Sequence, residues 1–163
     1  MRRSENSTLA ITYALTGETS SLRIPPPRLP GRAERLWQHT CFEVFIAEKG
    51  QQSYWEFNFS PSGEWAAYAF ESYRDGGPID DDGLHPKIQV RSAANSFELD
   101  AIVRLDRLPL ARPGTSLRLG LSAVIEENDG TLSYWALKHP TGKPDFHHPD
   151  SFDLELALPE KSA

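Results

Sequence analysis

The stretch YWEFNFSPSGEWAAYAF, residues 54–70, decides the fold, because it holds two strand-like runs and the turn between them. In such runs large apolar or aromatic residues recur at every second position, as on a strand with one face buried. Ser60-Pro61-Ser62-Gly63 separates the two runs. Proline presets φ for the second position of a turn and glycine relieves its exit, so the stretch is predicted to form a β-hairpin.

The same alternation extends over most of the chain and predicts an all-β fold. Further strands are expected at 9–15, 42–46, 88–90, 97–105, 117–125, 132–137 and 152–156. About nine to ten strands at these intervals indicate an antiparallel β-sandwich, similar to immunoglobulin or jelly-roll folds. With 163 residues and 39% hydrophobic content, the chain has enough apolar material for one sizeable core, and we expect a single domain over residues 1–163.

The overall charge disfavours nucleic acid and anionic membranes as partners. The formal net charge is -6 and the pI is near 5.3, so general attraction to phosphate groups is absent. The N-terminal residues lack the apolar run of a signal peptide, and Cys41 is the only cysteine, which suits a reducing compartment. We therefore expect a cytoplasmic protein.

Three stretches interrupt the strand pattern. Residues 24–35 contain a proline-rich segment that we interpret as a stiff connector. Residues 74–86 are acidic and rich in glycine, and they are predicted to form a mobile loop. Its DDDG run offers oxygen ligands that leave calcium open, but the spacing is not that of an EF-hand loop, and a solvated acidic turn is favoured.

The third stretch, WALKHPTGKPDFHHPDSF at 135–152, concentrates histidine, aspartate and proline. Zinc needs three or four converging ligands, and the spacing of His139, His147 and His148 is not one of the familiar patterns. Neighbouring residues in an extended segment also point to opposite sides. We therefore predict no metal site and no catalytic or metal cofactor for this stretch.

Catalytic motifs are also absent from the sequence, since it contains neither a GxSxG elbow nor a phosphate-binding glycine loop. Glu43 and Glu56 are the carboxylate pair to consider, of the type that glycosidases use. Both alternate with large apolar residues and so point away from the main core. A non-enzyme is predicted, and an enzyme would require both glutamates to face one cavity with at least one raised pKa.

Four tryptophans are more than a core of this size requires. Trp37 precedes the 42–46 strand in a loop-like segment, where its flat face suits stacking on a sugar or a planar cofactor. The other three, Trp55, Trp65 and Trp135, lie within predicted strands and are expected to fill the core or cover a sheet.

Four motifs occur in the order seen in the DOMON-like superfamily: LWQHTCFEVFIA (36–47), YWEFNFSPSGEW (54–65), FELDAIVRLDRLPLARPGTSLRLGLSAV (97–124) and DFHHPDSFDLEL (145–156). Over residues 36–156 the chain resembles family 9 carbohydrate-binding modules and uncharacterised bacterial DOMON-like proteins. The resemblance implies a β-sandwich that binds a small ligand, a carbohydrate or glycoside, without catalysis.

The resemblance also implies site residues. The sugar is held between two aromatic rings in the family 9 modules, and Trp37 and Phe146 occupy similar positions here. Glu43 and Asn58 resemble the residues that bond sugar hydroxyls. Glu56 stands where the sugar binders usually carry arginine, which reverses the charge. Further polar contacts are expected from Lys143, His147 and His148.

Two alternatives remain open at the sequence level. The same aromatic residues would serve a protein-interaction or homodimerisation module if they formed a large flat apolar surface, whereas a concave pocket favours a small ligand. The superfamily that the chain resembles also includes haem binders with a methionine ligand. Met1 is the only methionine, so haem would need ligation by histidine or by Lys138.

Overall fold

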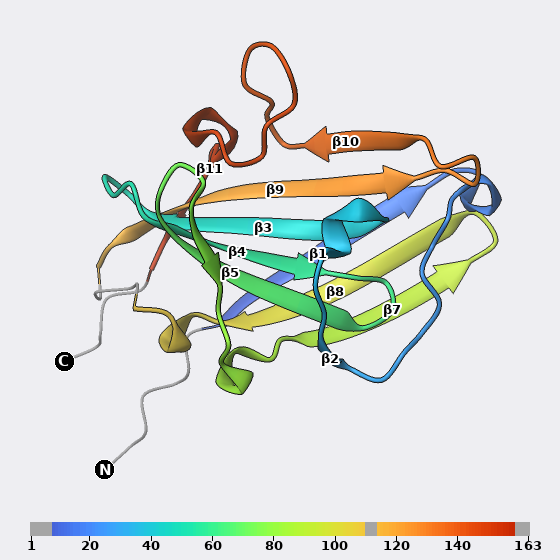
Figure 1. Ribbon diagram of the computed structural model, residues 1–163, viewed down its shortest axis with the longest axis horizontal. Helices are drawn as coiled ribbons and strands as arrows, with labels where there is room; N and C mark the ends of the chain where they lie inside the picture. Colours follow the sequence, from blue (N-terminus) through green and yellow to red (C-terminus); the bar gives the residue numbers. More distant parts are fainter. Residues whose placement is uncertain (1–7, 110–113, 159–163) are drawn as a thin grey trace.

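Two β-sheets form the part of the chain that the computed structural model describes, residues 8–109 and 114–158 (Figure 1). The smaller sheet has the order β1 (Thr8–Thr16), β8 (Ser96–Arg104), β7 (Lys87–Ala93). The larger sheet has the order β10 (Leu132–Ala136), β9 (Ser116–Glu126), β3 (Cys41–Glu48), β4 (Tyr54–Phe59), β5 (Glu64–Ser72), β2 (Gly31–Arg32). At its margins β11 (Leu154–Ala157) pairs with β9, and β6 (Asp75–Pro78) pairs with β5.

The described residues contain no α-helix, only short 3-10 helices. These are η1 (Thr19–Ser21), η2 (Leu36–Gln38), η3 (Asp82–Leu84), η4 (Leu105–Arg107) and η5 (Pro149–Ser151). Within the described part of the chain, no helix is long and apolar enough to span a membrane.

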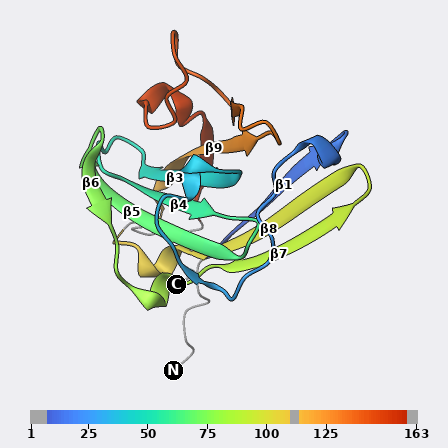
Figure 2. The same ribbon diagram turned by 45° about the vertical axis from the view of Figure 1, so that its right-hand side comes forward.

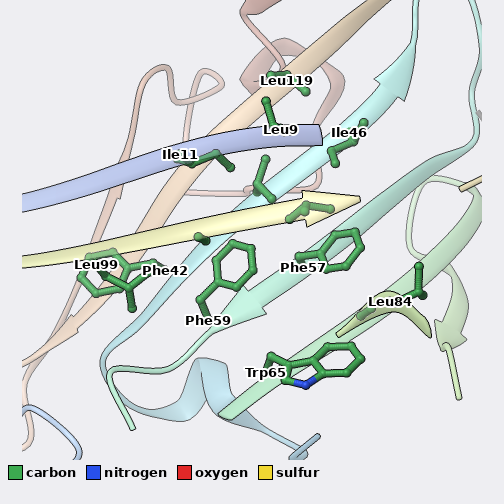
Figure 3. Close-up of a cluster of buried hydrophobic side chains, with 14 of the residues drawn as sticks. Leu9, Ile11, Phe42, Ile46, Phe57, Phe59, Trp65, Leu84, Leu99 and Leu119 are labelled. Carbon is green, nitrogen blue, oxygen red and sulfur yellow. The ribbon is translucent and has the colours of Figure 1, made fainter. Parts of the chain in front are cut away.

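The hydrophobic core lies between the two sheets (Figure 3). Strand β8 contributes every second residue to it, from Phe97 to Val103, and β3 contributes Phe42, Val44 and Ile46 in the same way. This is the period of two that places alternate side chains on one face of a strand. Each fully buried side chain of this kind stabilises the fold by roughly 1.5–3 kcal/mol.

The second face of the larger sheet is also covered in part, as β3 shows. Its residues from Cys41 to Ala47 are all buried, including those that point away from the core. Phe45 and Ala47 belong to a second, smaller cluster with Tyr54 and Phe152. The cover comes from residues 137–153, between β10 and β11, which we call the covering loop; Figure 2 shows this segment and the smaller sheet on opposite sides of the larger sheet.

Gly120 on β9 allows the covering loop to approach the sheet closely. A Cβ atom at this position would lie 3.1 Å from the carbonyl oxygen of Ser151 and 3.2 Å from the ring of Phe152. Such contacts are tighter than an ordinary side chain tolerates without displacement of its neighbours. The lack of a side chain at Gly120 therefore helps to position the loop that forms one wall of the site described below.

The predicted all-β sandwich is confirmed, and so is the hairpin at its centre. Strands β4 and β5 pair antiparallel up to Phe59 and Trp65, and the turn between them is closed by a hydrogen bond from the Ser60 N–H to the Glu64 carbonyl. Gly63 has a φ of 90°, a conformation that favours glycine. The other expected strands are present with shifts of up to three residues at their ends.

Four expectations about the fold need correction. The described chain has eleven strands, including β2 and β6, which the sequence pattern did not predict. Strand β2 also pairs parallel with β5, whereas an antiparallel sandwich was expected. Residues 74–86 were expected to be a mobile loop, but they contain β6 and η3, and the flanking carboxylates of Asp80 and Asp82 contact the guanidinium of Arg32. Trp135 was expected to fill the core or cover a sheet, yet it is 64% exposed on β10, at the sheet margin.

Candidate functional site

A cavity of about 400 Å³ opens on the face of the larger sheet that carries the covering loop. Strands β3, β4 and β5 supply its floor, and η2, β10 and the covering loop supply its walls. Half of the lining side chains are aromatic: Trp37, Tyr68, Phe70, Tyr134, Phe146 and the imidazole of His147. The polar and charged lining residues are Glu43, Glu56, Arg74 and Asp145.

Sheet register brings the two glutamates of the floor together. Glu43 on β3 lies opposite Asn58 on β4, and Glu56 lies two pairs further along, opposite Phe45. Side chains of paired residues share a face, so Glu43 and Glu56 are diagonal neighbours with Cβ atoms roughly 7 Å apart. Their residues are only 3% and 6% exposed. The alternation in the sequence predicted that they point away from the main core, and they do.

Burial keeps protons on this pair. It raises the pKa of Glu56 from 4.5 to about 7, although Asn58 and Arg74 act in the opposite direction. Burial raises the pKa of Glu43 well above 4.5, and repulsion from Glu56 raises it further. Two carboxyl groups that interact in this way titrate as a pair. At neutral pH the floor is therefore a partly protonated pair that can donate as well as accept hydrogen bonds.

Two buried polar side chains flank Glu43 in the same row of the sheet. Glu43 lies between Ser122 of β9 and Asn58 of β4. The amide nitrogen and oxygen of Asn58 and the hydroxyl of Ser122 all lack a hydrogen-bond partner of normal geometry among the described residues. Asn58 is nevertheless near enough to Glu56 to lower the pKa of that glutamate. Unpartnered buried polar groups are rare in folded proteins and call for a functional or solvent explanation.

Two aromatic side chains from distant parts of the chain line the cavity. Trp37 on η2 is 43% exposed and meets the ring of Tyr68 edge-on, with ring centroids 6.1 Å apart. Phe146 on the covering loop contacts Tyr134 edge-on at 6.1 Å and stacks against His139 at 6.3 Å. Both rings are thus held by aromatic neighbours while part of each faces the cavity.

Asp145 fixes the covering loop above the floor. Its carboxylate accepts hydrogen bonds from the Arg74 guanidinium at 2.9 Å and from the Tyr73 hydroxyl. It also accepts one from the backbone N–H of His147 at 3.1 Å. These contacts lower the pKa of Asp145, even though partial burial acts to raise it. The aspartate therefore carries its charge and neutralises Arg74.

His147 lies between the loop and the floor in its neutral form. Burial, with a smaller contribution from Arg74, lowers its pKa to about 4. The Tyr54 hydroxyl accepts the backbone N–H of Arg74 at 3.0 Å and is hydrogen-bonded to Nδ1 of His147 at 2.8 Å. The other ring nitrogen, Nε2, is 3.6 Å from a carboxyl oxygen of Glu56. That separation is too long for a direct hydrogen bond.

The cavity brings together five of the eight residues predicted to bind the ligand, namely Trp37, Glu43, Glu56, Phe146 and His147. The other three do not line it. Asn58 is fully buried beside Glu43 in the sheet, and Lys143 is exposed on the covering loop. The Nδ1 of His148 instead accepts the backbone N–H of Asp150 at the start of η5.

Sequence reasoning missed five lining residues of consequence, namely Tyr68, Phe70, Arg74, Tyr134 and Asp145. Tyr68 and Phe70 could have been found, because the hairpin register pairs them with Glu56 and Tyr54 on the same face. Arg74 follows β5 in a tight turn and has a φ of 55°, so no periodic pattern marks it.

The residues considered as cation or haem ligands have other partners. Asp81 accepts the backbone N–H of Gly83, and Lys138 forms an ion pair with Asp153 at 3.3 Å. Among residues 8–109 and 114–158, no group of three or more histidine, cysteine, aspartate or glutamate side chains is placed to hold a metal ion. Met1 lies outside the described residues.

Comparison with known proteins shows the fold. No protein-family model and no curated protein matches the chain. Among solved structures, the chain is similar to a "putative carbohydrate-binding protein" from Bacteroides uniformis, with a TM-score of 0.57 and 14% identity over 93% of this chain and 71% of that one. It is also similar to a family 9 carbohydrate-binding module from Caldicellulosiruptor kristjanssonii in complex with glucose, with a TM-score of 0.50 and 13% identity over 95% and 72%. The fold is therefore of the carbohydrate-binding-module type, while the resemblance to DOMON-like proteins stays a prediction.

Proposed function

We propose that the protein binds a sugar or small glycoside in this cavity without catalysis. The observation that carries the proposal is that Trp37 and Phe146, far apart in the chain, line one hollow whose floor holds carboxyl groups. Flat rings suit the C–H faces of a sugar, and carboxyl groups suit its vicinal hydroxyls. A volume of about 400 Å³ is in the range of small-ligand pockets. The carbohydrate-binding character of both similar structures supports the same ligand class.

A thermal-shift screen of neutral and amino hexoses and their methyl glycosides tests the proposal, because a ligand specific to the folded state raises its melting temperature. For a sugar that binds, calorimetry should show that Trp37→Ala and Phe146→Ala each weaken affinity roughly tenfold or more. Trp135→Ala is the matched control, since this exposed tryptophan lies outside the cavity. The proposal fails if no sugar binds, or if both cavity variants retain full affinity.

One observation favours a second candidate, acid–base catalysis on a glycoside. Glu43 and Glu56 line one cavity, and the pKa of Glu56 is raised to about 7, which suits a general acid near neutral pH. Release of nitrophenol from aryl glycosides, compared between the wild type and Glu56→Gln, separates the two functions. Turnover that the variant abolishes would establish an enzyme, whereas binding without turnover supports the non-catalytic proposal.

A docking or dimerisation surface is the alternative from another class. Tyr134, Trp135 and Leu137 are exposed on and just after β10, at the edge of the larger sheet. Trp37 and Phe146, however, line a concave cavity, which is the arrangement expected for a small ligand. Size measurement in solution at micromolar concentration distinguishes a monomer from a stable dimer.

A further inference from the structure

The positive charge that lines the cavity is paired with a carboxylate, whereas the two carboxyl groups of the floor have no cationic partner within the described part of the chain. Arg74 is the cationic side chain of the lining, and its guanidinium is paired with Asp145 at 2.9 Å. His147 contributes no positive charge near neutral pH, since its pKa is about 4. The carboxyl group of Glu43 has no hydrogen-bond or ion-pair partner among the described residues, and Glu56 has only the imidazole at 3.6 Å. The floor thus offers two carboxyl groups without a cation.

The surroundings of the two carboxyl groups favour a cation further. Trp37, Tyr68, Phe70, Tyr134 and Phe146 place aromatic rings around the cavity. The face of an aromatic ring is electron-rich and attracts ammonium groups, more strongly where water is excluded. The same rings still offer apolar contact to a sugar.

The unpartnered polar groups beside Glu43 indicate independently that this carboxyl group can become charged. The Asn58 amide carries N–H donors and the Ser122 side chain carries an O–H donor, and both lie directly beside Glu43 in the sheet. Donors of this kind stabilise a carboxylate once it becomes ionised. They are therefore placed to support a charged Glu43 when a cation enters.

We infer that the cavity is selective for a sugar that carries a protonated primary amine, with the ammonium group held between Glu43 and Glu56 and the sugar ring against Trp37 and Phe146. This rests on the proposed function and narrows its ligand class. An ammonium group has three donors and no acceptor, so it can bond both carboxylates at once. A neutral hydroxyl supplies a single donor and no charge.

Binding of a cation to this floor must release protons, because the amine favours the ionised carboxylates. The other titratable or charged groups near the pair are Tyr13 of β1, Cys41 of β3, Tyr54 of β4, Tyr68 of β5, Arg74 of the β5–β6 turn, and Asp145 and His147 of the covering loop. The pKa of Asp145 is lowered, so this carboxylate stays charged beside Arg74. Burial raises the pKa values of the three tyrosines and the thiol, so these groups stay neutral from pH 5 to 8. Arg74 stays charged and His147 neutral for most of this range, which leaves the two glutamates as the titrating groups.

Calorimetry on hexose pairs that differ at one position tests the inference. The 2-hydroxy, 2-amino and 2-acetamido forms of the gluco, galacto and manno sugars keep the ring and change the charge. We expect the best amino sugar to bind roughly tenfold more tightly than its hydroxy and acetamido forms at pH 7. Its affinity should rise from pH 5 to 7 with measurable proton release, whereas that of the neutral sugar should stay level or fall.

Variants separate a charge effect from a general effect on the site. Glu43→Gln and Glu56→Gln keep the side-chain shape, and each should weaken binding of the amino sugar much more than that of the neutral sugar, which removes most of the amino-sugar preference. Glu71→Gln is the control, because Glu71 is exposed on β5 and lies outside the cavity lining. Equal affinity for the amino and hydroxy forms, or a preference that survives both glutamine variants, overturns the inference and leaves the proposed function standing. Failure of every sugar to bind overturns both.

Discussion

Replacement of Glu56 by glutamine should stabilise the protein at alkaline pH and leave it nearly unchanged in acid. The side chain is buried on the floor of the cavity, and burial raises its pKa from 4.5 to about 7. A raised pKa means that the folded protein binds the proton more tightly than the unfolded chain does. The stability that this proton contributes is complete below pH 4.5 and is lost as the pH rises through 7.

The size of the effect follows from the difference between the two pKa values. About 2.5 pH units at 1.36 kcal/mol per unit correspond to on the order of 3 kcal/mol. Glutamine is neutral at every pH and has nearly the same shape as protonated glutamate. The variant should therefore match the wild type near pH 4.5 and exceed it by about 3 kcal/mol above pH 8, and the loss of repulsion on Glu43 acts in the same direction.

Urea unfolding followed by tryptophan fluorescence at several pH values between 4.5 and 8.5 measures this difference. His147, whose lowered pKa reduces stability below about pH 6.5, is present in both proteins, so its contribution largely cancels. Glu71→Gln, at an exposed position of β5, should change stability by less than about 0.5 kcal/mol at any pH. A Glu56→Gln effect that is constant with pH, or destabilising at pH 8, would refute the reasoning.

Three further predictions concern the fold. Gly120→Ala should destabilise the protein by roughly 1–3 kcal/mol in urea unfolding, because the new Cβ meets the covering loop, while Gly77→Ala, with open space at its Cβ, should cost less. Leu99→Ala should cost roughly 2–5 kcal/mol in the same assay, since Leu99 is fully buried between the sheets. Cys41 should not react with a thiol reagent at pH 8 until the protein unfolds, because burial raises its pKa and blocks access; rapid labelling of the native protein would contradict this.

Alternation along the chain was enough to predict the sandwich, because a strand with one face on the core repeats every two residues. It was not enough for β2, which is two residues long, or for its parallel pairing with β5. It also could not predict the exposure of Trp135. The paired Ala123 belongs to the core, but β10 is the last strand of the sheet and its outer residues have less to pack against.

The residues on the floor of the site could be predicted from the sequence, whereas many of the wall residues could not. Glu43 and Glu56 share a face because strands β3 and β4 are regular, and period two places both away from the core. Arg74 and Asp145 meet through a turn and a long loop whose paths depend on Gly120, Tyr73 and the fold as a whole. The contact between Arg74 and Asp145 depends on the tertiary structure and cannot be predicted from local sequence spacing.

The buried glutamates are better explained by a ligand than by the fold. Each lies in the interior without an ion-pair partner at hydrogen-bond distance among the described residues, and the pKa of Glu56 alone corresponds to a stability cost of about 3 kcal/mol above pH 8. Glutamine or an apolar residue of similar size would avoid that cost. A cluster that destabilises the unliganded fold, lines a cavity and sits beside the unpartnered Asn58 and Ser122 has the features of a site held ready for a bound group. The free energy of unfolding, measured with and without an amino sugar in the wild type and in Glu56→Gln, tests this explanation. The ligand should stabilise the wild type by at least as much as the buried carboxyl groups destabilise it.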